Sequence, residues 1–258
     1  MKSTDFAKCL SDYLSNYLPS MRNVSENTIK SYRDTFKLFL TYCRDFADIK
    51  IERLRFCDIN SKLVQNFLDW LATERQSAIS SCNQRLAAVR SFFRYAQIEM
   101  PDQMANIQGI LAIPMKRTTS APVNHLSPES IRLLLRQPDL ATANGRRDMV
   151  LLSLLYDTGA RVQELVDIVV KDVRLERPAK VRLNGKGRKI RDVPLMDSTV
   201  ALLKDYLDER KSKTFFSENE PLFCNKFGKK ISRAGVAYVL NKYFGQAKQN
   251  STTEINFP

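Results

Sequence analysis

VRLNGKGRKIRDVPL, residues 181–195, marks the place where the helical spacing of apolar residues gives way to a period of two. The run Asn184–Gly187 is turn-forming. Val181 and Leu183 alternate with polar residues before it, and Ile190 and Val193 are apolar residues after it. Alternation around an Asn-Gly turn predicts a β-hairpin. Residues 171–175 are a candidate third strand, so we expect a small antiparallel sheet.

The segments on either side of this hairpin have helical spacing. Upstream, an apolar helix is predicted to end at Gly159, and a short helix to begin at once in ARVQELVDI, residues 160–168. Downstream, Asp197 and Ser232 are predicted to cap two amphipathic helices. Their apolar residues are Val200, Leu203 and Leu207, then Val236, Leu240 and Tyr243. The predicted fold is therefore mainly α with a small antiparallel β-sheet.

The N-terminal third of the chain is predicted to be a small bundle of four helices. Ser25 is a favourable helix N-cap, and apolar residues recur at helical spacing after it. The four apolar stripes are Phe6, Leu10, Leu14; Ile29, Tyr32, Phe36, Phe39, Leu40, Cys43; Val64, Phe67, Leu68, Leu71; and Leu86, Val89, Phe92, Phe93, Ala96.

Proline separates this bundle from the rest of the chain. Pro101, Pro114 and Pro122 fall in a stretch without helical periodicity, which predicts an interdomain linker. Beyond it, Ser127 and Pro128 indicate the start of a helix. We predict a helical domain over residues 1–105, a linker over 106–124 and a second domain over 125–258.

The composition excludes several classes of protein. Glycine occurs 8 times in 258 residues, about half its usual frequency, which disfavours β-sandwiches and glycine-rich nucleotide-binding folds. The 5 cysteines form no C-x-x-C pair, and the 1 histidine cannot build a His-rich metal site. No apolar run approaches the ~20 residues of a membrane-spanning helix. We expect a cytoplasmic protein with no membrane partner, no metal and no cofactor.

Positive charge is concentrated in the second half of the chain. Lys and Arg total 41 against 28 Asp and Glu, a net charge of +13, and Lys171–Arg191 alone contains nine basic and two acidic residues. Such clustering favours a polyanion such as duplex DNA, because each neutralised phosphate releases counterions. The alternative is a solvated surface that raises solubility.

Candidate contacts to DNA lie on the predicted helices, the linker, the hairpin and the segment before the last helix. They are Arg85, Arg90, Arg94, Lys116, Arg117, Arg188, Lys189, Arg191, Lys229, Lys230 and Arg233. The alternative is that the arginines on helices are exposed and contact only solvent, because such arginines show the same spacing in the sequence.

Two residues are candidates for chemistry. Arg161 follows the turn Thr158–Ala160 at the start of a helix, where its guanidinium would lie near amides suited to an anion. Glu164 is one turn further on and could hold that arginine in place. Lys186 is at the tip of the basic hairpin, from which it could reach a phosphodiester. Taken singly, each could also be an ordinary surface residue.

Together, these segments resemble one family. YDTGARVQEL, residues 156–165, resembles the first conserved box of the tyrosine recombinase (phage-type integrase) family, and NGKGRKIRDVPL, residues 184–195, resembles its lysine-bearing hairpin. VSENTIKSYRDTFKLFL and NQRLAAVRSFFRYA resemble its SAM-like core-binding domain, and HLSPESIRLLL the start of its catalytic domain. PLFCNKFGKKISRAGVAYVLNKYF resembles the stretch that leads toward the second box.

The resemblance implies metal-free phosphoryl transfer by a site-specific recombinase or integrase of a mobile element. A tyrosine attacks a DNA phosphodiester to form a 3′-phosphotyrosyl link, which a 5′-hydroxyl of a second duplex later attacks. Arg161 would stabilise charge on the nonbridging oxygens, Lys186 would protonate the departing 5′ oxygen, and Glu164 would support Arg161. The family self-associates on DNA, with a tetramer expected.

The sequence also departs from the family. The family requires a His-x-x-Arg box and a later nucleophilic tyrosine, whereas the only histidine here, His125, precedes Arg161 and the last tyrosine is Tyr243. Tyr238 and Tyr243 fall on the last amphipathic helix, where core packing is the expected role. We therefore expect a C-terminally truncated recombinase that binds DNA without cleaving it. The alternatives are a non-catalytic protein that occupies recombination sites and an unrelated basic regulator.

Overall fold

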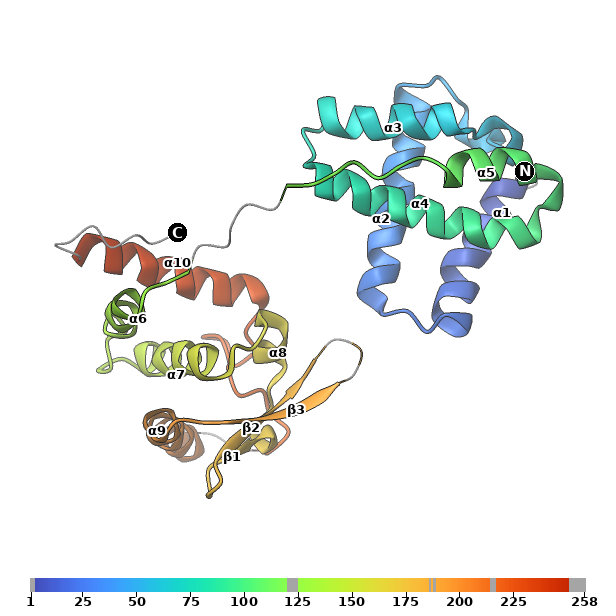
Figure 1. The fold of residues 1–258 in the computed structure, drawn as a ribbon. Helices are drawn as coiled ribbons and strands as arrows, with labels where there is room; N and C mark the ends of the chain where they lie inside the picture. The colour runs from blue at the N-terminus through green and yellow to red at the C-terminus, as the bar shows by residue number, and fades with distance from the viewer. Residues whose placement is uncertain (1–2, 120–124, 186, 188, 214–216, 251–258) are drawn as a thin grey trace. The chain divides into compact units, whose positions relative to one another are not determined.

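A computed structural model describes residues 3–119, 125–185, 187, 189–213 and 217–250. The chain divides into two compact units, Met1–Ala121 and Pro122–Pro258 (Figure 1). Both are mainly helical, and a three-stranded antiparallel sheet lies in the second. The predicted fold class is confirmed. Among the described residues, every helix is too short or too polar to cross a membrane.

The first unit contains the predicted N-terminal helices. Its α-helices are α1 (Asp5–Asp12), α2 (Glu26–Asp45), α3 (Ser61–Thr73), α4 (Ile79–Glu99) and α5 (Met104–Leu111). A π-helix, η1 (Tyr13–Met21), continues α1, and short 3₁₀ turns are η2 (Ile51–Arg53), η3 (Phe56–Asp58) and η4 (Pro101–Gln103). Side chains cap three of these helices, because Thr4, Ser25 and Asn60 accept from amides of the first turn.

Aromatic rings fill the core of the first unit. Phe92 of α4 lies between Phe6 of α1 and Phe36 of α2, with ring centroids 5.7 and 5.1 Å from its own, both edge-on. Tyr13 and Phe56 complete the cluster. These side chains come from the apolar stripes and from η1 and η3, so helical periodicity alone predicts most of this core.

The predicted linker begins later than residue 106. Residues 106–111 belong to α5, and Ile107, Ile110 and Ile113 are buried in the core of the first unit. The prolines do not mark the start of the linker. Pro101 stands at the first position of η4 and Pro114 follows α5, so neither proline interrupts α5. The segment without regular secondary structure starts at Ile113.

The second unit consists of helices around one small sheet. Its elements are α6 (Pro128–Leu135), α7 (Ala143–Thr158), α8 (Val162–Asp167), the 3₁₀ turn η5 (Val170–Asp172), β1 (Val173–Arg174), β2 (Lys180–Asn184), β3 (Ile190–Pro194), α9 (Asp197–Lys213) and α10 (Arg233–Asn250). The strand order is β1-β2-β3, all antiparallel, with Val181 opposite both Val173 and Val193. The hairpin prediction is confirmed, and the third strand is shorter than predicted.

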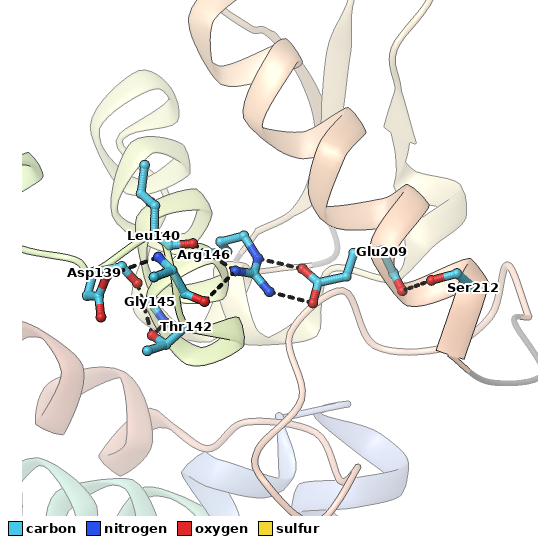
Figure 2. Close-up of polar contacts among 8 residues, drawn as sticks. Asp139, Leu140, Thr142, Gly145, Arg146, Glu209 and Ser212 are labelled. Carbon is cyan, nitrogen blue, oxygen red and sulfur yellow. Dashed lines mark hydrogen bonds and ion pairs between the residues drawn. The ribbon is translucent and has the colours of Figure 1, made fainter.

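Helix α7 is the centre of this unit, with α9 on one side and α10 on the other (Figure 1). At its first turn, Arg146 donates from Nε and Nη2 to the carboxylate of Glu209 on α9, both at 2.7 Å. The same guanidinium donates to the carbonyl of Leu140, as Figure 2 shows. Gly145 is required here, since a Cβ would lie 1.9 Å from the carbonyl oxygen of Asp139.

A buried carboxylate joins α7 to α10. Asp148 accepts from Nε and Nη2 of Arg147 at 2.9 and 2.6 Å, and its other oxygen accepts from the hydroxyl of Tyr243 at 3.0 Å. Tyr243 is buried, as its stripe predicts. Tyr238 is 70% exposed, so the prediction of core packing is wrong for it. At ~100° per residue, position 238 lies on the opposite face from Val236.

Candidate functional site

The junction between α7 and α8 directs Arg161 outward. Helix α7 ends at Gly159, which has a φ of +55°, and the amide of Ala160 donates to the hydroxyl of Thr158 at 3.2 Å. Arg161 then adopts an extended backbone as the N-cap residue of α8. Glycine at the left-handed position turns the chain sharply, so Arg161 begins the next helix with its side chain 70% exposed.

Glu164 holds Arg161 from within the first turn of α8. Its Oε2 accepts from the backbone amide of Arg161 at 3.0 Å, and its Oε1 accepts from Nη1 of the same residue at 2.8 Å. The carboxylate thus caps the helix and braces the guanidinium. Because Glu164 is only 4% exposed, this brace is largely shielded from competing water.

A second arginine reaches the same carboxylate from the sheet. Arg191 of β3 donates from Nη2 to Oε2 of Glu164 at 2.7 Å and from Nη1 to Oε1 at 3.2 Å. The hydrogen bonds from Arg191, followed by those from Arg161, hold the pKa of Glu164 at about 2, against the effect of burial. The sequence predicts Arg191 as a DNA contact, and no local pattern predicts its pairing with Glu164, because the two are 27 positions apart.

The cluster carries a net positive charge at its exposed edge. Two guanidinium groups share one carboxylate, and Arg161 is the more exposed of the two. A planar guanidinium whose opposite edge is already fixed presents its remaining N–H groups in a defined orientation. This arrangement suits a tetrahedral oxyanion such as a phosphodiester.

The base of the β2–β3 turn lies against this cluster. Gly185 donates its amide to the carbonyl of Lys189 at 2.7 Å, and a Cβ at position 185 would lie 3.2 Å from Oε1 of Glu164. A larger residue at position 185 would therefore crowd the carboxylate of Glu164 that holds Arg161. Lys189 is exposed. Lys186 and Arg188, predicted as the catalytic acid and a DNA contact, lie outside the described residues.

The candidate DNA contacts of the first unit differ in their surroundings. Arg85 donates from Nη1 to the carbonyl of Ser31 and the hydroxyl of Thr35, both at 3.1 Å, so it joins α4 to α2. Nε of Arg90 is buried without a hydrogen-bond partner among the described residues. Lys116 pairs with Asp69 at 3.2 Å, while Arg94 and Arg117 are exposed.

In the second unit, the basic segment before α10 lies near α8. Lys230 pairs with Asp167, the last residue of α8, while Lys229 and Arg233 are exposed. Within the part of the chain that the structure describes, no three His, Cys, Asp or Glu side chains gather as metal ligands would.

The chain belongs to the phage integrase family. The model of the phage integrase family matches residues 124–257, and that of the phage integrase N-terminal SAM-like domain matches residues 11–99. A Sinorhizobium fredii protein named as an integrase/recombinase, y4rC, is 37% identical, with 94% of this chain and 72% of that protein covered. The tyrosine recombinase XerD of Staphylococcus epidermidis is 31% identical, with 94% and 79% covered. The resemblance seen in the sequence is thereby confirmed.

Solved structures share the fold. The XerH site-specific recombinase, in a post-cleavage complex with its palindromic difH substrate, matches with a TM-score of 0.66 and 20% identity over 93% of this chain and 71% of that one. The Tn1549 transposon integrase, in complex with circular intermediate DNA, matches with a TM-score of 0.67 and 16% identity over 97% and 80%.

Proposed function

We propose that this protein acts in site-specific DNA recombination of the tyrosine recombinase type, and that Arg161 binds the phosphate at which strands are exchanged. The observation that carries the proposal is the exposed guanidinium of Arg161, held by buried Glu164 beside the basic hairpin. The names of the similar proteins support the same reaction class, since they are tyrosine recombinases and integrases.

Each member of the cluster has a distinct task in this proposal. Arg161 donates to the nonbridging oxygens of the phosphodiester, whose charge increases as the phosphorus becomes five-coordinate. Glu164 and Arg191 are positioning residues, because they fix the guanidinium and limit its rotamers. In the family that the sequence resembles, the hairpin lysine, here Lys186, protonates the 5′ oxygen that departs when the nucleophilic tyrosine attacks. The sequence contains no His-x-x-Arg motif, so the steps proposed for this chain are DNA binding and phosphate binding.

We further propose duplex DNA as the partner of both units, with the helical unit as the core-binding domain. Lambda integrase, matched at 16% identity, has been solved as a tetramer on a Holliday junction, which supports assembly on DNA as a property to test here. The similar proteins come from Sinorhizobium fredii and Staphylococcus epidermidis, bacteria whose DNA is in the cytoplasm. A protein that acts on DNA would therefore act in the cytoplasm, which is the localisation we propose.

The test compares two arginines in similar settings. Arg161 and Arg132 are 70% and 71% exposed, and each pairs with a glutamate three positions away. We expect the affinity for a labelled duplex to fall steeply with salt, and Arg161→Ala to reduce the slope of log K against log salt by about 1, as one lost phosphate contact would. Arg132→Ala on α6 should leave the slope unchanged. Salt-independent binding, or equal effects of the two variants, would refute the proposal.

A further inference from the structure

A tight basic turn projects from the core of the second unit. We call residues 224–230 the Phe227 turn. A β-bridge between Cys224 and Lys230 joins its ends, and the amide of Ile231 donates to the carbonyl of Phe223 at 3.0 Å. Phe223 and Ile231 are both buried, so the turn stands on a fixed base.

Asn225 fixes the conformation of the turn. Its side-chain Oδ1 accepts from the backbone amides of Phe227 and Lys229 at 2.9 and 3.1 Å, and its backbone amide donates to the carbonyl of Lys229 at 2.7 Å. Gly228 has a φ of +72°, a conformation that favours glycine. The side chain at position 227 is therefore presented by an ordered backbone.

The side chains that this turn presents are basic and aromatic. Phe227 is 74% exposed, and Nζ of Lys226 lies 5.0 Å from its ring centroid. Residues 226–233 contain four basic residues and no acidic one. The Phe227 ring lies outside the core of this unit, between two lysines in the sequence, Lys226 and Lys229.

The Phe227 turn is tied to the helix that Arg161 begins. Nζ of Lys230 donates to Oδ1 of Asp167, whose Oδ2 accepts from Nε2 of Gln163 at 2.8 Å. Helix α8 has 6 residues, which is about 9 Å along its axis at ~1.5 Å per residue. DNA bound at Arg161 would therefore pass close to the turn.

We propose that the Phe227 turn is a second DNA contact, in which the Phe227 ring packs on the sugar and base edges of the duplex that flanks the phosphate at Arg161. Lys226 and Lys229 bind the phosphates on either side of the ring. This inference rests on the proposed function. Lysine contacts release counterions and weaken with salt, whereas an aromatic contact contributes affinity that salt changes little.

The test separates these two contributions. The full chain is titrated into a fluorescein-labelled, mixed-sequence duplex at several salt concentrations, with anisotropy as the readout. Phe227→Ala should weaken binding by on the order of ten-fold at every salt concentration with an unchanged slope, because the lost contact buries apolar surface and no charge. Phe227→Trp should restore the affinity. Lys229→Gln should instead lower the slope by about 1.

Controls use matched residues on other elements. Leu140→Ala removes an exposed apolar side chain from the loop before α7, and Lys204→Gln removes an exposed charge from α9. Neither should change the affinity. Circular dichroism checks that each variant is folded, as expected for exposed positions.

Two results would overturn the inference while leaving the proposed function intact. The first is salt-dependent binding by the wild type with Phe227→Ala equal to it at every salt concentration. The second is a Phe227→Ala variant with unchanged DNA affinity but altered sedimentation, which would assign the ring to a protein partner. A wild type that binds DNA independently of salt would instead remove the proposed function itself.

Discussion

Replacing Glu164 with glutamine tests whether the pairing of Glu164 with Arg161 and Arg191 stabilises the folded protein. The change keeps the shape of the side chain and one acceptor oxygen, but it removes the charge shared by Arg161 and Arg191. Hydrogen bonds to charged groups contribute about 1.5–3 kcal/mol each. Because Arg161 and Arg191 reach solvent and can be rehydrated, we expect the variant to lose less than the sum, about 2 kcal/mol of unfolding free energy.

The assay is thermal unfolding followed by circular dichroism, with urea titration as a second measurement. A loss of about 2 kcal/mol corresponds to a decrease in Tm of roughly 4–8 °C for a unit of this size. The control is Glu176→Gln, which removes the same charge from an exposed loop. Equal melting temperatures for the two variants would refute the role assigned to Glu164.

Acid should remove the same contribution from the wild type. The pKa of Glu164 is lowered from an ordinary value of 4.5 to about 2 in the folded protein. The charged carboxylate therefore contributes its full stabilisation at pH values above about 4.5. That stability is lost as the pH falls from about 4.5 toward 2. The difference between wild type and Glu164→Gln should therefore shrink over this interval. A difference in unfolding free energy between the two proteins that stays constant from about pH 4.5 to about pH 2 would contradict the pairing.

Three further results are expected. Limited trypsin digestion without DNA should cut first after Arg117, which is exposed and outside any helix, whereas early cleavage within Glu26–Asp45 would contradict the division into units. Tyr243→Phe should lower stability by about 1–2 kcal/mol in urea titration, because Asp148 loses a buried donor, with Tyr238→Phe unchanged. This 258-residue chain should form no covalent adduct with a nicked suicide substrate, since its sequence contains no His-x-x-Arg motif and Tyr243 is buried with its hydroxyl donating to Asp148. A band on a denaturing gel that disappears in Tyr238→Phe or Tyr243→Phe would contradict this.

Local sequence patterns determine most of the elements. Ser25 and Ser127 accept from first-turn amides where capping predicts it, and Gly159 ends α7 in the left-handed region. The Val181 and Val193 pair lies in register across the hairpin. These features depend on residues close together in the chain, so backbone sterics, capping and apolar periodicity suffice to predict them.

The tertiary structure decides which charged side chains meet. Arg191 pairs with Glu164 and Lys230 with Asp167, although the sequence alone predicts Arg191 and Lys230 only as DNA contacts and Glu164 only as the support of Arg161. The first pair forms because the sheet packs against α8, and the second because the chain returns to the end of α8 just before α10. Their partners lie 27 and 63 positions apart, beyond the reach of any local pattern. The sequence thus determines where Arg161 begins a helix and that Glu164, three positions further on, can hold its guanidinium. Only the packing of the sheet on that helix brings Arg191 to the same carboxylate.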